Sequence, residues 1–147
     1  MALSGNFLFP TATMTNVPDL SLSVTATDAT AGIVVSSDGG VQVNSALVGQ
    51  YVIVDIFLFV DIPATATTGL TTKQVARRRV FAANAVAQQA VSNWSFSVVD
   101  VEPPGGPYTY RVAAQLVGNN GSNAVVSGSS TTVPWLRGTL TAVVINK

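Results

Sequence analysis

One stretch, Tyr51 to Val60, restricts the fold of this chain more than any other. It reads Tyr-Val-Ile-Val-Asp-Ile-Phe-Leu-Phe-Val, and nearly every residue is β-branched or aromatic, as in a β-strand. Successive side chains of a strand point to opposite faces, and both alternating sets are apolar here, apart from Asp55. We therefore expect this strand to be covered twice, by a second sheet on one face and by something else, such as another subunit, on the other.

The amino-acid composition is also unusual for a soluble domain. Of the 147 residues, 48% are apolar and only 10% are charged, whereas about a quarter are charged in an ordinary soluble domain. The exterior is then rich in neutral polar residues or partly buried against other copies of the chain. No run of about 20 apolar residues is present, so no membrane-spanning helix and no membrane insertion are predicted.

The length predicts a single domain over residues 1–147. Residues 1–18 are predicted to form an N-terminal arm or edge strand, because Pro10 and Pro18 do not suit a central strand. The first residues lack a basic segment followed by a long apolar core, so no Sec signal is visible.

The charged and reactive residues exclude several classes of function. Seven basic and seven acidic residues give a formal charge of zero, which offers no electrostatic attraction for nucleic acid. Cysteine and histidine are both absent, which argues against zinc, iron–sulfur and thiol chemistry and removes the commonest general base. We expect no catalytic residue, no cofactor and no bound metal, and a chain that is not an enzyme.

The rest of the chain reads as short strands separated by turns. Strands are predicted at 20–26, 33–35, 92–100, 108–116, 125–126 and 136–145, and a turn at 102–107. Asp38-Gly39-Gly40 and Gly118-Asn119-Asn120-Gly121 are predicted to be hairpin turns. Residues 63–72 are predicted to be a loop, and 73–90 fit either a strand pair or a short helix, with strands favoured. About eight to ten strands predict an antiparallel sandwich or jelly roll.

Two acidic positions are candidates for a site. Asp55 lies inside the buried strand, and pairing with an arginine such as Arg111 or Arg79, or with backbone donors, is favoured over metal binding or a carboxylate pair, because an unpaired buried charge is costly. Asp100 and Glu102 lie two positions apart beside a Pro-Gly turn, where two carboxylates would make a weak calcium site. Charge on a solvated loop is the favoured interpretation of that pair.

Two further groups of charged residues receive structural interpretations. Asp61 precedes Ile-Pro and is assigned to a turn. The run Arg77-Arg78-Arg79 would divide between two faces of a strand, so a solvated edge or a salt bridge between subunits is favoured over a nucleic-acid patch.

The aromatic residues are either sugar-stacking platforms or parts of a core. Trp94 and the tyrosines alternate along strands and are assigned to a core or a subunit seam. Trp135, in Val-Pro-Trp-Leu, is the best candidate for an exposed aromatic that contacts a ligand. Such a ligand would be held at loops such as 63–72 or 128–135.

Five segments together are similar to bacterial and phage domains of the C1q/TNF-like jelly-roll superfamily, including the C-terminal domain of collagen-like spore-surface glycoproteins. They are Val17–Val24, Val60–Pro63, Trp94–Ser97, Pro104–Val112 and Leu136–Ile145. The resemblance implies a compact jelly roll of about ten strands that assembles as a tight homotrimer. It also implies a place at the tip of a fibre or phage tail, although no Gly-X-Y repeat precedes the domain here.

A trimer would supply the second cover that the central strand requires. The residues expected at its interface are Tyr51, Ile53, Phe57, Phe59, Tyr108 and Tyr110. We expect the assembled chain to resist heat, because its charge is low, its central strand is apolar on both faces and thiols are absent.

Three functions follow from these expectations. The first is a structural and interaction module, a homotrimer on a bacterial surface, spore exosporium or fibre, where its partners are its own copies and a collagen-like or other fibrous stalk. The alternative is a phage or bacterial receptor-binding, lectin-like adhesin domain that contacts a surface glycan or receptor. The third is a jelly-roll capsid or filament subunit. Each places the protein outside the cell or on a spore or virion surface.

Overall fold

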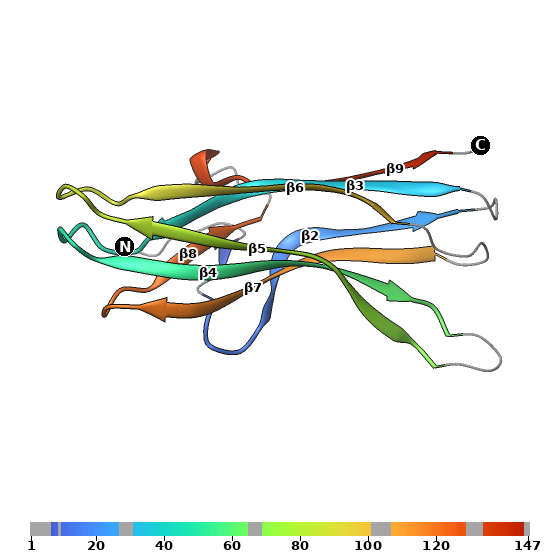
Figure 1. Ribbon diagram of the computed structural model, residues 1–147, viewed down its shortest axis with the longest axis horizontal. Coiled ribbons are helices and arrows are strands. Elements are labelled where there is room, and N and C mark those ends of the chain that lie inside the picture. The colour runs from blue at the N-terminus through green and yellow to red at the C-terminus, as the bar shows by residue number, and fades with distance from the viewer. Residues whose placement is uncertain are drawn as a thin grey trace.

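The chain folds into two antiparallel β-sheets packed face to face, as the computed structural model shows (Figure 1). The structure describes residues 7–8, 10–26, 31–64, 69–100, 107–128 and 134–145. The β3 sheet has five strands: β1 (Phe7–Leu8), β3 (Gly32–Val43), β6 (Val91–Asp100), β8 (Ala124–Ser127) and β9 (Thr139–Ile145). The β4 sheet has four: β2 (Thr15–Thr25), β4 (Tyr51–Ile62), β5 (Thr71–Ala83) and β7 (Pro107–Asn119). The predicted antiparallel all-β sandwich is confirmed.

The core lies between the two sheets and is built from one alternating set of each strand. The inward set of β4 is completely buried, because it faces the β3 sheet; it consists of Val52, Val54, Ile56, Leu58 and Val60. Trp94 and Phe96 of β6 meet it from the other sheet, as the predicted alternation of that strand requires. No helix among the described residues is long and apolar enough to cross a membrane.

Two strands share one position beside β3. Residues 124–126 of β8 pair with one end of β3, and residues 139–145 of β9 pair with the rest of it. The chain leaves the sheet between them, and the amide of Gly138 donates a hydrogen bond of 2.7 Å to the carbonyl of Gly128, which closes the excursion. Its short 3-10 helix η1 (Pro134–Leu136) contacts β3.

The hairpin turn predicted at Asp38-Gly39-Gly40 is wrong, because β3 continues through these residues. The glycines make room for side chains instead of a turn. A Cβ atom on Gly39 would lie 2.2 Å from the indole of Trp94, which is its partner on β6. A Cβ atom on Gly40 would lie 2.8 Å from the side chain of Leu136 in η1.

Other predicted boundaries also change. The ambiguous segment 73–90 contains most of the long strand β5 and then a loop, so strand is confirmed over helix, but the predicted pair of strands is wrong. Residues 118–121 do not form a hairpin, since β7 and β8 belong to different sheets. Much of the turn at 102–107 and parts of loops 63–72 and 128–135 lie outside the described residues.

The N-terminal segment is more regular than an arm. β1 is an edge strand paired with β8, and β2 is an edge strand paired with β7. Pro18 falls in β2 where the pairing register shifts, and the next residue, Asp19, has a φ of 59°. A proline is tolerated here because the irregular edge position requires no complete hydrogen-bond ladder.

Candidate functional site

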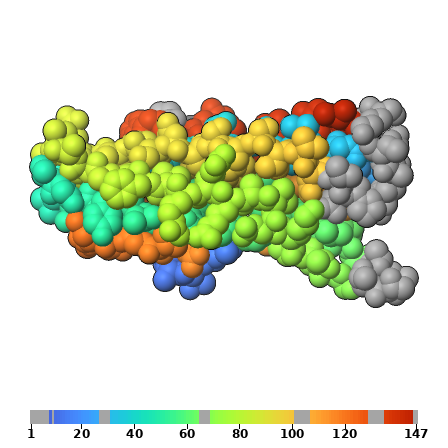
Figure 2. All heavy atoms as spheres, viewed as in Figure 1, coloured from blue at the N-terminus to red at the C-terminus, as the bar shows by residue number. Residues whose placement is uncertain are grey.

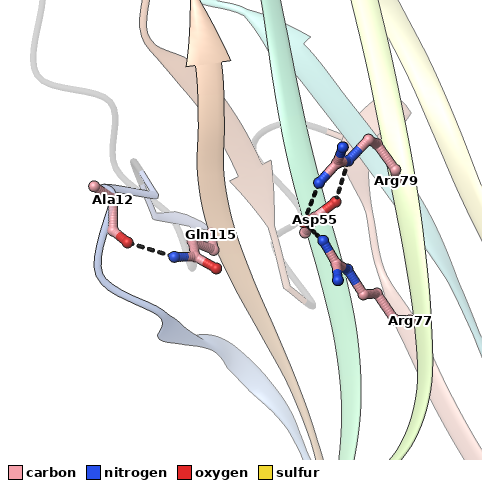
Figure 3. Close-up of polar contacts among 5 residues, drawn as sticks. All are labelled: Ala12, Asp55, Arg77, Arg79 and Gln115. Carbon is pink, nitrogen blue, oxygen red and sulfur yellow. Dashed lines mark hydrogen bonds and ion pairs between the residues drawn. The ribbon is translucent and has the colours of Figure 1, made fainter.

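The outer face of β4 carries a buried acid between two arginines (Figure 3). Asp55 lies opposite Arg79 of β5, which donates two hydrogen bonds to its carboxylate, from Nε at 2.8 Å and from the terminal nitrogen at 2.9 Å. Arg77, two residues along the same face, donates to the same carboxylate. Hydrogen bonds from Arg79 hold the pKa of Asp55 below its usual value, against the opposing effect of burial and with further help from Arg77.

The prediction that Asp55 pairs with Arg79 is confirmed, and its alternative, Arg111, is wrong. The run of three arginines divides between the two faces of β5, as predicted. Arg78, the middle arginine, is paired with the residue of β4 that follows Asp55, and this residue belongs to the opposite face. The run lies on β5, an edge strand of its sheet, and all three arginines are exposed, so the predicted solvated edge is confirmed. Arg77 and Arg79 also form ion pairs with an acid of their own chain. The Asp55 cluster therefore consists of ion pairs within one chain.

Arginines also cover the aromatic side chains of β4. The guanidinium of Arg77 lies over the Phe57 ring at 5.4 Å, and that of Arg111 lies over the Phe59 ring at 4.9 Å. The two rings stack with centroids 5.8 Å apart. Cations above aromatic faces are attracted by the ring quadrupole, so these contacts stabilise the covered face.

Asp61 belongs to β4, and its assignment to a turn is wrong. It accepts hydrogen bonds from Arg111 at 3.0 Å and from the hydroxyl of Thr72 at 2.6 Å. Burial raises the pKa of Asp61, but these two hydrogen bonds outweigh it and leave the pKa below its usual value. The carboxylate links β7 to the start of β5 across β4.

The residues expected at a subunit interface therefore divide into two groups. Tyr51, Ile53, Phe57 and Phe59 share the outer face of β4, where Phe57 is buried and the others are half-buried. Tyr108 and Tyr110 instead lie in the core of their own chain. The second cover that β4 requires is supplied in large part by arginines of the same chain.

The sequence favoured a charge on a solvated loop for Asp100, and this interpretation is wrong. Asp100 is buried at the end of β6, where it accepts hydrogen bonds from Lys73 of β5 at 2.9 Å and from the hydroxyl of Tyr110 at 3.1 Å. These contacts join the two sheets at the edge where β5 and β6 run side by side, the side that faces the viewer in Figure 2. Glu102 lies outside the described residues, among which no group of three potential metal ligands occurs.

The other outer face, on the β3 sheet, contains a hollow of about 300 Å³. Trp135 lines it and is 60% exposed, as predicted for this residue. Its neighbour Leu136 is completely buried and packs with Val125 of β8, so η1 is anchored while the indole stays in solvent. The remaining lining residues are Asp38, Gly39, Asn93, Trp94, Ser95 and Arg137.

The same face carries an apolar row that sequence reasoning missed. Val34 of β3 lies between Val99 of β6 and Val143 of β9, which are 69% and 54% exposed. Ile145, next in the outward set of β9, is 48% exposed. The alternation of β6 and β9 placed these residues outward, but only the strand order shows that they are neighbours.

Comparisons with known proteins do not assign the chain to a family. No protein-family model matches it, and no curated protein sequence is similar to it.

Proposed function

We propose that this chain is a structural and interaction module, a non-enzymatic homotrimeric jelly roll of C1q/TNF type on a bacterial or spore surface or on a fibre. The order of strand pairing supports the jelly-roll topology. A single long hairpin of eight strands would place the first strand beside the last, the second beside the seventh, and so on. The structure has these pairs: β1·β8, β2·β7, β3·β6 and β4·β5. The additional pairs β4·β7 and β3·β8 form when such a hairpin rolls up into two sheets. Because β9 continues the position of β8, nine strands fill the eight positions of a jelly roll.

The observation that carries the assembly is the apolar row of Val34, Val99, Val143 and Ile145, in which Val34 is half-buried and the other three are exposed. Neighbouring apolar side chains on three adjacent strands are unusual on the surface of a monomer, and they are typical of an interface between subunits. The outer face of β4 gives weaker support, because its own arginines already cover Phe57 and Phe59. We therefore place the contact between copies on the β3 sheet.

The test is the mass of the native particle, measured by multi-angle light scattering. We expect three times the mass of one chain, and a single-chain mass for the double variant Val99→Asp/Val143→Asp, because two charges would lose their water in the interface. Val117→Asp is the matched control, since Val117 is also exposed but belongs to the β4 sheet. A native particle of one chain would overturn the trimer, and a trimeric double variant would overturn the placement of the contact.

A second candidate function, receptor binding, is favoured by the hollow beside Trp135. Leu136 anchors the helix in a buried contact, whereas the exposed side chain of Trp135 adds nothing to the core of the domain. An exposed tryptophan next to polar side chains is a common feature of surfaces that recognise partners. This function is compatible with the first, because the hollow and the apolar row lie at different positions along β3.

A further inference from the structure

We propose that the hollow on the outer face of the β3 sheet binds one pyranose ring of a neutral glycan, with Trp135 as the stacking platform. The proposal rests on the receptor-binding function and gives it a ligand class and a set of residues. A volume of about 300 Å³ lies at the lower end of small-molecule sites, which suits one sugar ring rather than a large ligand.

The first step of the argument is the aromatic surface. A pyranose has apolar C–H faces and a rim of hydroxyl groups, so it needs a flat apolar surface that remains accessible from water. Trp135 has this accessibility, and its position is fixed by the buried side chain of Leu136. Gly40 permits the anchor, because any Cβ atom there would lie 2.8 Å from the Leu136 side chain. The backbone that carries the platform is thus held in place before a ligand binds.

The second step is the set of polar groups around the platform. Each sugar hydroxyl both donates and accepts a hydrogen bond, so a sugar site needs both kinds of partner. Asp38 provides acceptor oxygens, and the hydroxyl of Thr139 fixes its carboxylate with a hydrogen bond of 2.8 Å. Arg137 and Asn93 provide donors, and Ser95, directly opposite Asp38 on β6, provides a hydroxyl group.

The third step is charge. No ion pair joins Arg137 to Asp38 or to any other residue that the structure describes, so its donors remain available to a ligand. One acid and one base line the hollow, so their charges balance. This balance gives an anionic sugar no net attraction, because Asp38 repels the charge that Arg137 attracts, so a neutral sugar is the better fit. It also argues against a divalent cation, because a single carboxylate beside an arginine is a poor cation site.

The proposed trimer leaves the hollow accessible. The apolar row crosses β3 at Val34, and the hollow lies at Asp38, four residues or about 13 Å farther along the strand. Three copies would then carry three hollows, which would strengthen binding to a branched or surface-attached glycan through multivalency. Binding of a free monosaccharide by one hollow does not depend on the trimer.

The test begins with a glycan array that displays neutral and acidic saccharides, probed with the full chain. The neutral sugar that binds is then titrated as its methyl glycoside by calorimetry. We expect Trp135→Ala to weaken binding by about tenfold or more, and Arg137→Gln to weaken it as well. Phe81→Ala is the matched control, because Phe81 is an aromatic residue of the β4 sheet with 58% exposure, and its loss should leave affinity unchanged.

Several results would overturn the proposal. They are an array without any bound neutral glycan, full affinity in the Trp135→Ala variant, and binding restricted to acidic glycans that Arg137→Gln abolishes. Circular dichroism shows whether each variant is folded. We expect both variants to fold, because the side chains of Trp135 and Arg137 are exposed. Light scattering on the same samples reports the trimer separately, so a failed glycan site and a failed assembly give different results.

Discussion

Asp55 shows how an acid is accommodated in a strand whose neighbours are apolar. Its side chain is only 1% exposed, whereas those of Arg77 and Arg79 are about half exposed. The carboxylate thus exchanges water for two guanidinium groups, which themselves stay hydrated on their outer sides. This arrangement lowers the cost of burying the charge, because only one of the three groups loses most of its water.

We expect Asp55→Asn to destabilise the fold by about 2 kcal/mol at neutral pH, since hydrogen bonds to charged groups contribute about 1.5–3 kcal/mol each and the arginines regain water. The folded-state pKa of Asp55 lies below its unfolded value of about 3.9. Its contribution is therefore fully present above that unfolded value and is lost as the pH falls through the folded pKa. The difference between wild type and variant should shrink on acidification, measured by urea unfolding from pH 7 to pH 2. A difference that stays constant over this range would contradict the assignment.

The sequence predicted only part of this cluster. An acid in an apolar strand requires a partner, and Arg79 was one of two named. The participation of Arg77 and the separate pairing of Arg111 with Asp61 depend on the registers of β5 and β7 against β4. A register is set by contacts along the whole strand pair, which the local sequence pattern does not specify.

At the scale of secondary-structure elements, β3 shows the same limit. Asp-Gly-Gly is typical of a turn when it is considered alone. In the fold, Gly39 lies opposite Trp94, 55 positions later in the sequence, and the absence of a side chain gives the indole its place in the core. The strands with regular alternation, such as β6 and β7, were predicted well because burial on one face dictates their pattern.

Gly39→Ala should destabilise the protein by about 1–3 kcal/mol, because the new methyl group would overlap the Trp94 ring and force it to shift. The added cost should be smaller in a Trp94→Leu background, so a double-mutant cycle measured by chemical unfolding should show coupling. Gly69→Ala is the matched control, since a Cβ atom there would meet nothing within 4 Å. Additive effects of the two substitutions would contradict a direct steric contact.

At the scale of the whole molecule, the two outer faces differ in kind. On the β4 sheet, arginines, ion pairs and aromatic stacking from the same chain cover the middle of the outer face, whereas Phe81 and Val117 remain exposed. The β3 sheet leaves valines and a tryptophan exposed. The sequence predicted that a doubly apolar strand needs two covers, but it could not show that long arginine side chains of a neighbouring strand supply one of them.

If copies associate through the β3 sheet, the melting temperature should rise with protein concentration, because association stabilises the folded chains by mass action. We also expect the melting temperature of the trimer to exceed about 65 °C, the upper end of the ordinary mesophile range. Differential scanning calorimetry at two concentrations tests both expectations. A transition that is independent of concentration and falls within the ordinary range would contradict them.

The excursion between β8 and β9 has a consequence for how such a domain diversifies. The backbone departs at Gly128 and rejoins the same ladder at Gly138, so the sheet's hydrogen bonding resumes as though nothing had been inserted. Provided that the Leu136 anchor is kept, evolution or a protein engineer can rewrite the intervening residues and change the surface that the domain presents, while the scaffold beneath stays as it is.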